Sequence, residues 1–187
     1  MSGVPAFRRV FYIAVLGSVC LFALPYFARV LRADSLPRVQ LNADLIQPRE
    51  IEDLTGKNVA RDYALAWKDL SDALDNNRAA ALNGYFTGFA KDVLNSRVAE
   101  QKRAGIHTRY VDHGHHASAI FYSADGGEMQ LIDEANLEMQ IFEGDKILHR
   151  EQGTQKFVVL MTPGADRWFV RALQPVADAE LPDSRRR

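Results

Sequence analysis

The chain has 187 residues, so one compact domain is the default expectation. Its 23 Lys and Arg residues nearly balance 24 Asp and Glu, which argues against a nucleic-acid-binding protein, because such a protein needs an excess of cations. Apolar residues make up 47%, enough for a packed core. The single cysteine, Cys20, excludes a disulfide within the chain and a metal centre built from several cysteines.

A run without charge extends from Val10 to Ala28. A helix of about 19 residues spans ~28 Å, close to the ~30 Å hydrocarbon core of a bilayer. Aromatic residues lie at both ends, and arginines bracket the run. We therefore expect a single transmembrane anchor within an N-terminal segment of residues 1–33. A cleaved signal peptide is the second interpretation, but the run is longer than a usual signal core and no small-residue cleavage site follows it.

The short, basic N-terminal tail favours a cytoplasmic N-terminus. The domain would then lie on the outer (periplasmic or extracytoplasmic) side of the cell membrane. Basic residues flank the anchor on both sides, so the opposite orientation stays open. Residues 34–56 contain Pro37 and Pro48 and show no sustained period, which predicts a linker. Residues 176–187 are expected to form a disordered tail.

The domain expected over residues 57–175 opens with a helix. Asn58 is its expected N-cap, and the Asp75-Asn76-Asn77 segment is expected to end it. Apolar residues recur at spacings of three and four, which places them on one helix face: Val59, Tyr63, Trp67, Leu70 and Leu74. A short second helix is expected after Asn77.

A third helix is expected from about Phe89 to Arg103. Gly105 would end it, because glycine readily adopts the left-handed conformation common at helix C-termini. Phe89, Val93 and Leu94 would form its buried face.

After Gly105 the period changes to two, which predicts strands. They are expected over residues 106–113, 115–123, 128–143, 146–161 (one long strand, or two interrupted near Gly153) and 167–174. The clearest is 128–143, where the odd positions are apolar apart from Asp133 and the even positions are mostly polar. Such alternation is typical of an antiparallel sheet with one packed face.

Helices followed by a meander of long strands form an α+β layout. The segments YALAWKDLSDALDNN, RAAALNGYF, DEANLEMQIFEGDKILHR and GADRWFVRALQP, in this order, resemble the nuclear-transport-factor-2-like superfamily, the cystatin-like α+β cone. The resemblance covers most of residues 58–175. It implies three helices packed on the concave face of a curved antiparallel sheet, placed here after an N-terminal transmembrane helix. It also makes a homodimer through the sheet an expected assembly.

The superfamily includes enzymes that use an Asp or His inside the cone as a general base, which implies this catalytic role for Asp133. On the apolar strand face, burial would raise the pKa of this carboxyl toward neutrality. A bulge or strand end at Asp133-Glu134 would instead place it in water. The residues expected to contact a ligand in the interior are Trp67, Tyr63, Leu137 and Met139.

The histidines suggest a metal site. His113 and His115 are expected on one side of a strand, and His149 with Glu151 on another, and two histidines with a carboxylate can hold a non-haem metal. No glutamate follows His115 at the short distance that a cupin-like site would need. We therefore expect no metal and no other cofactor, and interpret this segment as a polar strand joint kinked at Gly114.

Two functions stay open. The first is a membrane-tethered, non-enzymatic binding or assembly module with a protein partner in the same membrane, because a tether raises local concentration. Its layout resembles the inner-membrane assembly factor of type IV secretion systems. The second is a membrane-tethered enzyme or carrier of a small apolar ligand. An interior cavity of ~300 Å³ or more with an acid or His at its base would favour the second; an interior filled by Trp67, Phe86, Met129 and Met139 would favour the first.

Overall fold

The computed structural model describes residues 36–44 and 46–176. Its elements, in chain order, are β1 (Val39–Asn42), α2 (Asp53–Asp75), the 3-10 helix η1 (Ala79–Asn83), α3 (Gly88–Ala104), β2 (Ile106–Tyr122), β3 (Met129–Glu143), β4 (Lys146–Pro163) and β5 (Trp168–Val176). The strands form one sheet in the order β1-β2-β3-β4-β5. β1 is parallel to β2, and every other neighbouring pair is antiparallel.

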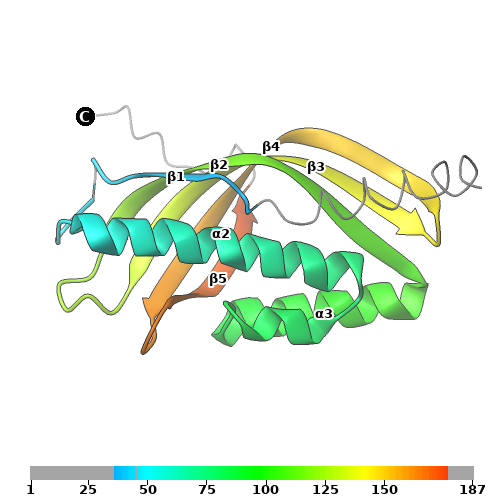
Figure 1. Ribbon diagram of the computed structural model, residues 1–187, viewed down its shortest axis with the longest axis horizontal. Coiled ribbons are helices and arrows are strands. Elements are labelled where there is room, and N and C mark those ends of the chain that lie inside the picture. The colour runs from blue at the N-terminus through cyan, green and yellow to red at the C-terminus, as the bar shows by residue number, and fades with distance from the viewer. Residues whose placement is uncertain (1–35, 45, 177–187) are drawn as a thin grey trace, which may run out of the picture. The chain divides into compact units, whose positions relative to one another are not determined.

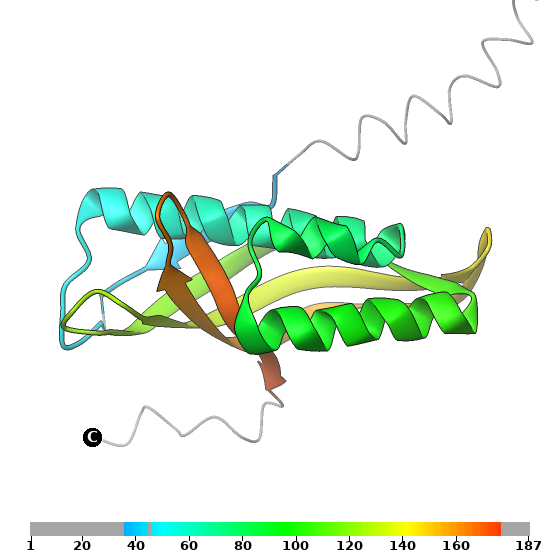
Figure 2. The same cartoon turned by 90° about the horizontal axis from the view of Figure 1, so that it is seen from below.

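Both α-helices lie on the same side of the sheet, beneath its arch (Figure 1). Figure 2, seen from the helix side, shows both running along the sheet. The α+β layout with a curved sheet agrees with the expected fold class. The short second helix expected after Asn77 is the 3-10 helix Ala79–Asn83, so the described chain has two α-helices rather than three on the sheet. Five residues are too few for two α-helical turns, and such short pieces suit 3-10 geometry.

The transmembrane anchor predicted at Val10–Ala28 lies outside the described residues, as does the tail after Val176. Within residues 36–44 and 46–176, no helix is both long enough and apolar enough to cross a bilayer.

The prediction of a linker over residues 34–56 is wrong, because β1 and the start of α2 lie within this segment. Residues Val39–Asn42 pair with His115–Ser118 of β2, and Val39 and Leu41 pack against the core. A strand of four residues is too short to show a period, so sequence alone gives no signal for it. α2 also begins earlier than expected, with Glu52 rather than Asn58 as its N-cap. The folded domain therefore includes residues 36–44 and 46–56 of the segment assigned to the linker.

α2 buries the face that its apolar spacing predicts. The five residues at that spacing are all buried: Val59, Tyr63, Trp67, Leu70 and Leu74. Asp62 is also fully buried, and its Oδ2 accepts a hydrogen bond of 2.8 Å from the backbone N–H of Trp168, which joins α2 to the start of β5.

α3 ends at Gly105 as predicted, with this glycine in the left-handed conformation (φ 70°). Its predicted buried face is wrong in part. Phe89 and Val93 are exposed, at 57% and 45%, whereas Leu94 is buried. The buried positions are instead Ala90, Leu94, Val98 and Gln101. The prediction failed because it relied on large apolar residues, whereas this face contains the small Ala90 and the polar Gln101.

β2 is one continuous strand rather than two. The pairing with β3 shifts by one residue between Asp112, opposite Leu137, and Gly114, opposite Asn136. This is a β-bulge at His113, and Gly114 has a φ of 129° there. Side chains of a strand alternate between its two faces. The extra residue shifts this alternation by one, so even-numbered residues face the interior before the bulge and odd-numbered residues face it directly afterwards. Asp112 before the bulge and His115 after it can therefore both face the interior.

Candidate functional site

Asp133 lies in the centre of the sheet and is fully buried. It is opposite Ala117 of β2 and Phe157 of β4, with no register shift at this point of β3. Its side chain lies on the inner face of β3, where the alternation of that strand places it.

A continuous chain of polar contacts passes through Asp133. Tyr63 Oη donates a hydrogen bond of 2.7 Å to Asp133 Oδ2. The same oxygen is 2.7 Å from His115 Nδ1, and His115 Nε2 is 2.7 Å from Asp112 Oδ2. α2, β2 and β3 thus each contribute a polar group to one interior cluster, defined here as Tyr63, Asp112, His115 and Asp133.

His115 carries a positive charge in this cluster. Both its ring nitrogens face carboxylate oxygens, which requires each nitrogen to donate a proton. Burial lowers the pKa of His115, but the hydrogen bonds to Asp112 and Asp133 outweigh it and raise the pKa to about 9. Burial and then the charge of Asp133 raise the pKa of Tyr63 well above its ordinary value, so the phenol stays a neutral donor.

The indole ring of Trp67 fills the space beside the cluster. Its ring centroid lies 4.7 Å from that of His115 and 5.3 Å from that of Phe157. Tyr63 and Tyr110 meet it edge to face at 6.4 and 6.1 Å. Among the described residues, neither Trp67 Nε1 nor Asp133 Oδ1 has a hydrogen-bond partner, although both atoms are buried.

The interior around this cluster is packed with side chains. Phe86, Met129 and Leu137 are buried, and Met139 is half-buried. Two hollows formed by the described residues lie on the outside of the domain. One, of about 560 Å³, lies on the outer face of α3 beside Phe89 and Val93. The other, of about 330 Å³, lies between β1 and the start of α2.

The chemistry open to Asp133 follows from this packing. Its Oδ2 already accepts hydrogen bonds from Tyr63 and His115, so only Oδ1 could take a proton from another group. A general base must lie within hydrogen-bond reach of that proton. With Trp67 and the cluster in these positions, the described structure offers Oδ1 no open space for a substrate.

The structure brings some of the expected site residues together and separates others. Tyr63 and Trp67 lie against the Asp133 cluster. Leu137 is buried and is paired with Asp112, the residue before the bulge. Met139 lies two residues further along β3 and is only half-buried.

The expected common side for His113 and His115 is wrong. His115 is 1% exposed, whereas His113 is the bulged residue and lies in solvent. His149 and Glu151 lie on the exposed part of β4, with Nε2 and Oε2 3.5 Å apart. The described part of the chain contains no group of three His, Cys, Asp or Glu residues placed to hold a metal ion.

Sequence reasoning missed the pairing of His115 with two aspartates. One local signal was present: His115 is two and four residues before Ala117 and Ala119, so it lies on the same strand face as these buried residues. The pairing itself depends on the register of β2 against β3 and on the bulge, which shifts Asp112 inward. Neither can be read from one strand alone.

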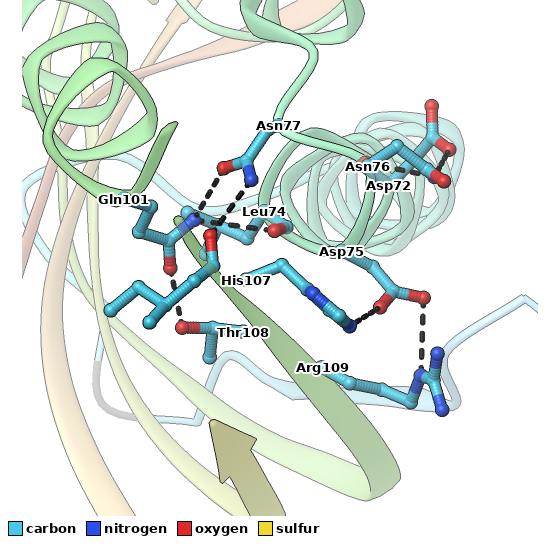
Figure 3. Close-up of polar contacts among 10 residues, drawn as sticks. Asp72, Leu74, Asp75, Asn76, Asn77, Gln101, His107, Thr108 and Arg109 are labelled. Atoms are coloured by element: carbon cyan, nitrogen blue, oxygen red, sulfur yellow. Dashed lines mark hydrogen bonds and ion pairs between the residues drawn. The ribbon is translucent and has the colours of Figure 1, made fainter. Parts of the chain in front are cut away.

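A second polar cluster ties the ends of α2 and α3 to the start of β2 (Figure 3). The buried Gln101 donates from Nε2 to Leu74 O and to Asn77 Oδ1, each at 3.2 Å. Thr108 Oγ1 donates to Gln101 Oε1. Asn77 Nδ2 donates to the backbone oxygen of Ile106 at 2.8 Å. These contacts satisfy one another, so this cluster is a structural junction.

Asp75 extends the junction toward the surface (Figure 3). Its carboxylate oxygens lie 3.1 Å from Arg109 Nε and 3.6 Å from His107 Nε2. The His107 ring stacks on Phe142 at 4.9 Å, and the Arg109 guanidinium lies 4.8 Å from the same ring centroid. The C-terminal end of α2 is thereby held against β2 and β3.

The chain matches no known family model and no curated protein. It is similar in structure to the intermembrane space region of the chloroplast protein ARC6, with a TM-score of 0.57 and 16% identity, over 70% of this chain and 99% of that one. Aln2 from a Streptomyces species has a TM-score of 0.46 and 13% identity, over 70% and 96%. ActVI-ORFA from Streptomyces coelicolor has a TM-score of 0.44 and 14% identity, over 65% and 96%.

The ARC6 region has a nuclear-transport-factor-2-like cone fold. At 16% identity, the similarity to the ARC6 region shows a shared fold and no more. The cone expected from the order of elements is therefore confirmed at the level of architecture.

Proposed function

We propose that this domain is a non-enzymatic binding or assembly module, tethered to a membrane by the apolar segment Val10–Ala28. The observation that supports it is the filled interior. The large ring of Trp67 is buried and lies 4.7 Å from the ring of His115, and Asp133 Oδ1 is buried as well.

Opening that interior would be energetically unfavourable. Moving the Trp67 ring would give up buried contacts of a kind whose removal costs about 3–5 kcal/mol. Separating His115 from either aspartate would leave a buried charge without its partner, at a similar cost. Recognition is therefore assigned to the outer surface. Large apolar side chains are exposed there on both α3 and β4: Phe89, Val93, Ile147 and Leu148.

The partner in this proposal is a protein in the same membrane. Tethering confines both molecules to one surface, so even a weak contact is populated at the raised local concentration. A homodimer through the outer face of the sheet is a second assembly compatible with the proposal.

An enzyme or carrier of a small apolar ligand is the other candidate. One observation favours it: Asp133 Oδ1 is buried beside a charged histidine and has no hydrogen-bond partner among the described residues. A ligand that displaced the Trp67 ring could meet this oxygen, and Asp133 would then serve as the base.

Titration of the full chain with small aromatic ligands separates the two candidates. In a Trp168→Phe variant, Trp67 is the only tryptophan and its fluorescence reports on the interior. We expect no saturable change with benzene or indane. A Leu137→Ala variant in the same background is the positive control, because apolar cavities made by Leu→Ala changes bind such ligands.

Saturable binding by the parent, abolished by Leu137→Trp, would overturn the module and make Asp133→Asn the next variant. Absence of binding in the parent together with binding in Leu137→Ala would support a closed interior.

A further inference from the structure

β4 is longer than the strand that covers it. β5 pairs with β4 only from Lys156 to Pro163, where Val176 is opposite Lys156. Residues 146–155 of β4 pair with β3 on one side. No residue of the described ranges pairs with them on the other side, and residues 146–154 are exposed. This segment, 146–155, is the open edge of the sheet.

The direction of the backbone groups on this edge follows from Pro175. It is opposite Phe157 and has no N–H, so this pair cannot exchange two hydrogen bonds. In an antiparallel ladder the bonded pairs alternate with the non-bonded ones, so Val176 and Lys156 form a bonded pair. The register of β4 is unbroken from Lys156 back to His149. The N–H groups of Thr154 and Gln152 therefore point outward from the open edge.

We infer that the C-terminal segment 177–181 continues β5 and covers the inner half of this open edge, residues 151–155. The chain leaves β5 at Val176, beside the first uncovered residue of β4 and in the antiparallel direction. Continuing the register places Asp178 opposite Thr154 and Glu180 opposite Gln152. Residues 177–187 are long enough to follow the edge to its end.

Charge complementarity supports this register. Arg150 and Lys156 lie on the same face of β4, where they pair with Glu138 and Glu134 of β3. In the continued register Asp178 is diagonal to Lys156 and Glu180 is diagonal to Arg150, on that same face. Each cation would then lie between one carboxylate of β3 and one of the C-terminal segment.

Pro182 explains where the pairing stops. It would be opposite Arg150, at a bonded position, and proline cannot donate the hydrogen bond that this position needs. The outer half of the edge, from Lys146 to Arg150, stays uncovered in this arrangement.

Backbone amide hydrogen exchange tests the proposal on the full chain in detergent micelles. We expect the amides of Gln152 and Thr154 to exchange at least about tenfold more slowly than in a chain ending at Val176. Proline substitutions test the register. Glu180→Pro removes a predicted donor and should abolish the protection. Ala179→Pro, whose N–H would point away from β4, should retain most of it. Glu180→Gln is the control for charge.

Unprotected amides in both chains would overturn the proposal, since the edge would then be free. Protection that survives truncation at Val176 and grows with protein concentration would also overturn it, by placing a second copy on the edge. Loss of protection with Ala179→Pro but not with Glu180→Pro would contradict the register. None of these outcomes bears on whether the interior binds a ligand.

Discussion

The charge of His115 depends on the two carboxylates that its ring nitrogens face. Its folded pKa of about 9 lies above the ordinary value of 6.5. A raised pKa stabilises the fold fully below pH 6.5, and this contribution is lost as the pH rises through 9. The difference corresponds to about 3 kcal/mol.

We therefore predict that the free energy of unfolding, measured with urea, falls by about 3 kcal/mol between pH 6.5 and pH 9. A His115→Gln variant should be less stable at pH 6.5 and should show a flatter dependence over this window. The titration of His115 followed by NMR gives the same pKa without any variant. A midpoint near 6.5, or an equal slope in the variant, would contradict the prediction.

Asp133 is predicted to be essential for stability. Asp133→Asn keeps the shape but removes the charge that faces buried His115. Breaking a buried ion pair costs about 3–5 kcal/mol, so we expect a loss near 3 kcal/mol in urea unfolding. Glu134→Gln, the same change on the exposed face one residue away, should cost less than about 1 kcal/mol. Equal effects would mean that the charge of Asp133 contributes little.

At the scale of elements, the end of α3 depends on backbone conformation at Gly105. A Cβ at this position meets no atom within 4 Å, yet φ is 70°. Gly105→Ala should therefore cost about 1 kcal/mol through backbone strain alone. Gly153 in β4 is equally uncrowded and has no positive φ, so Gly153→Ala should be neutral or slightly stabilising. Thermal unfolding of both variants measures the difference, and equal midpoints would contradict it.

Elements differ in how far their sequence predicts them. α2 and β3 have long regular periods; α2 buries its predicted face, and β3 does so from Met129 to Leu137. α3 does not, because its buried face combines Ala90 and Gln101 with only two larger apolar residues. Its rotation is set by tertiary contacts such as that of Gln101 with the carbonyl of Leu74.

At the scale of the whole molecule, β1 closes one edge of the sheet. It covers β2 at the level of His115, and Val39 and Leu41 pack against the core. We predict that a chain beginning at residue 36 unfolds cooperatively, and that one beginning at residue 47 loses about 2–3 kcal/mol, since the three partly buried apolar side chains of Val39, Leu41 and Ile46 are lost. Urea unfolding of the two chains measures this. Equal stabilities would restore the interpretation of residues 34–56 as a linker.

The sequence by itself indicated the α+β class, the inward face of α2 and the position of Asp133 on the apolar face of β3. These features follow from local periods of three to four and of two, which need no knowledge of neighbouring strands. Trp67 and Tyr63 were placed on the inner face of α2 by the same spacing.

Only the tertiary structure decided the rest of the site. The bulge at His113 turns Asp112 and His115 inward, and the pairing of β2 with β3 sets His115 beside Asp133. β1 and the open edge of β4 likewise exist only through strand pairing. The physical reason is shared: register and bulges are fixed by contacts between residues distant in the chain, and a one-residue shift exchanges the buried and exposed faces of a strand.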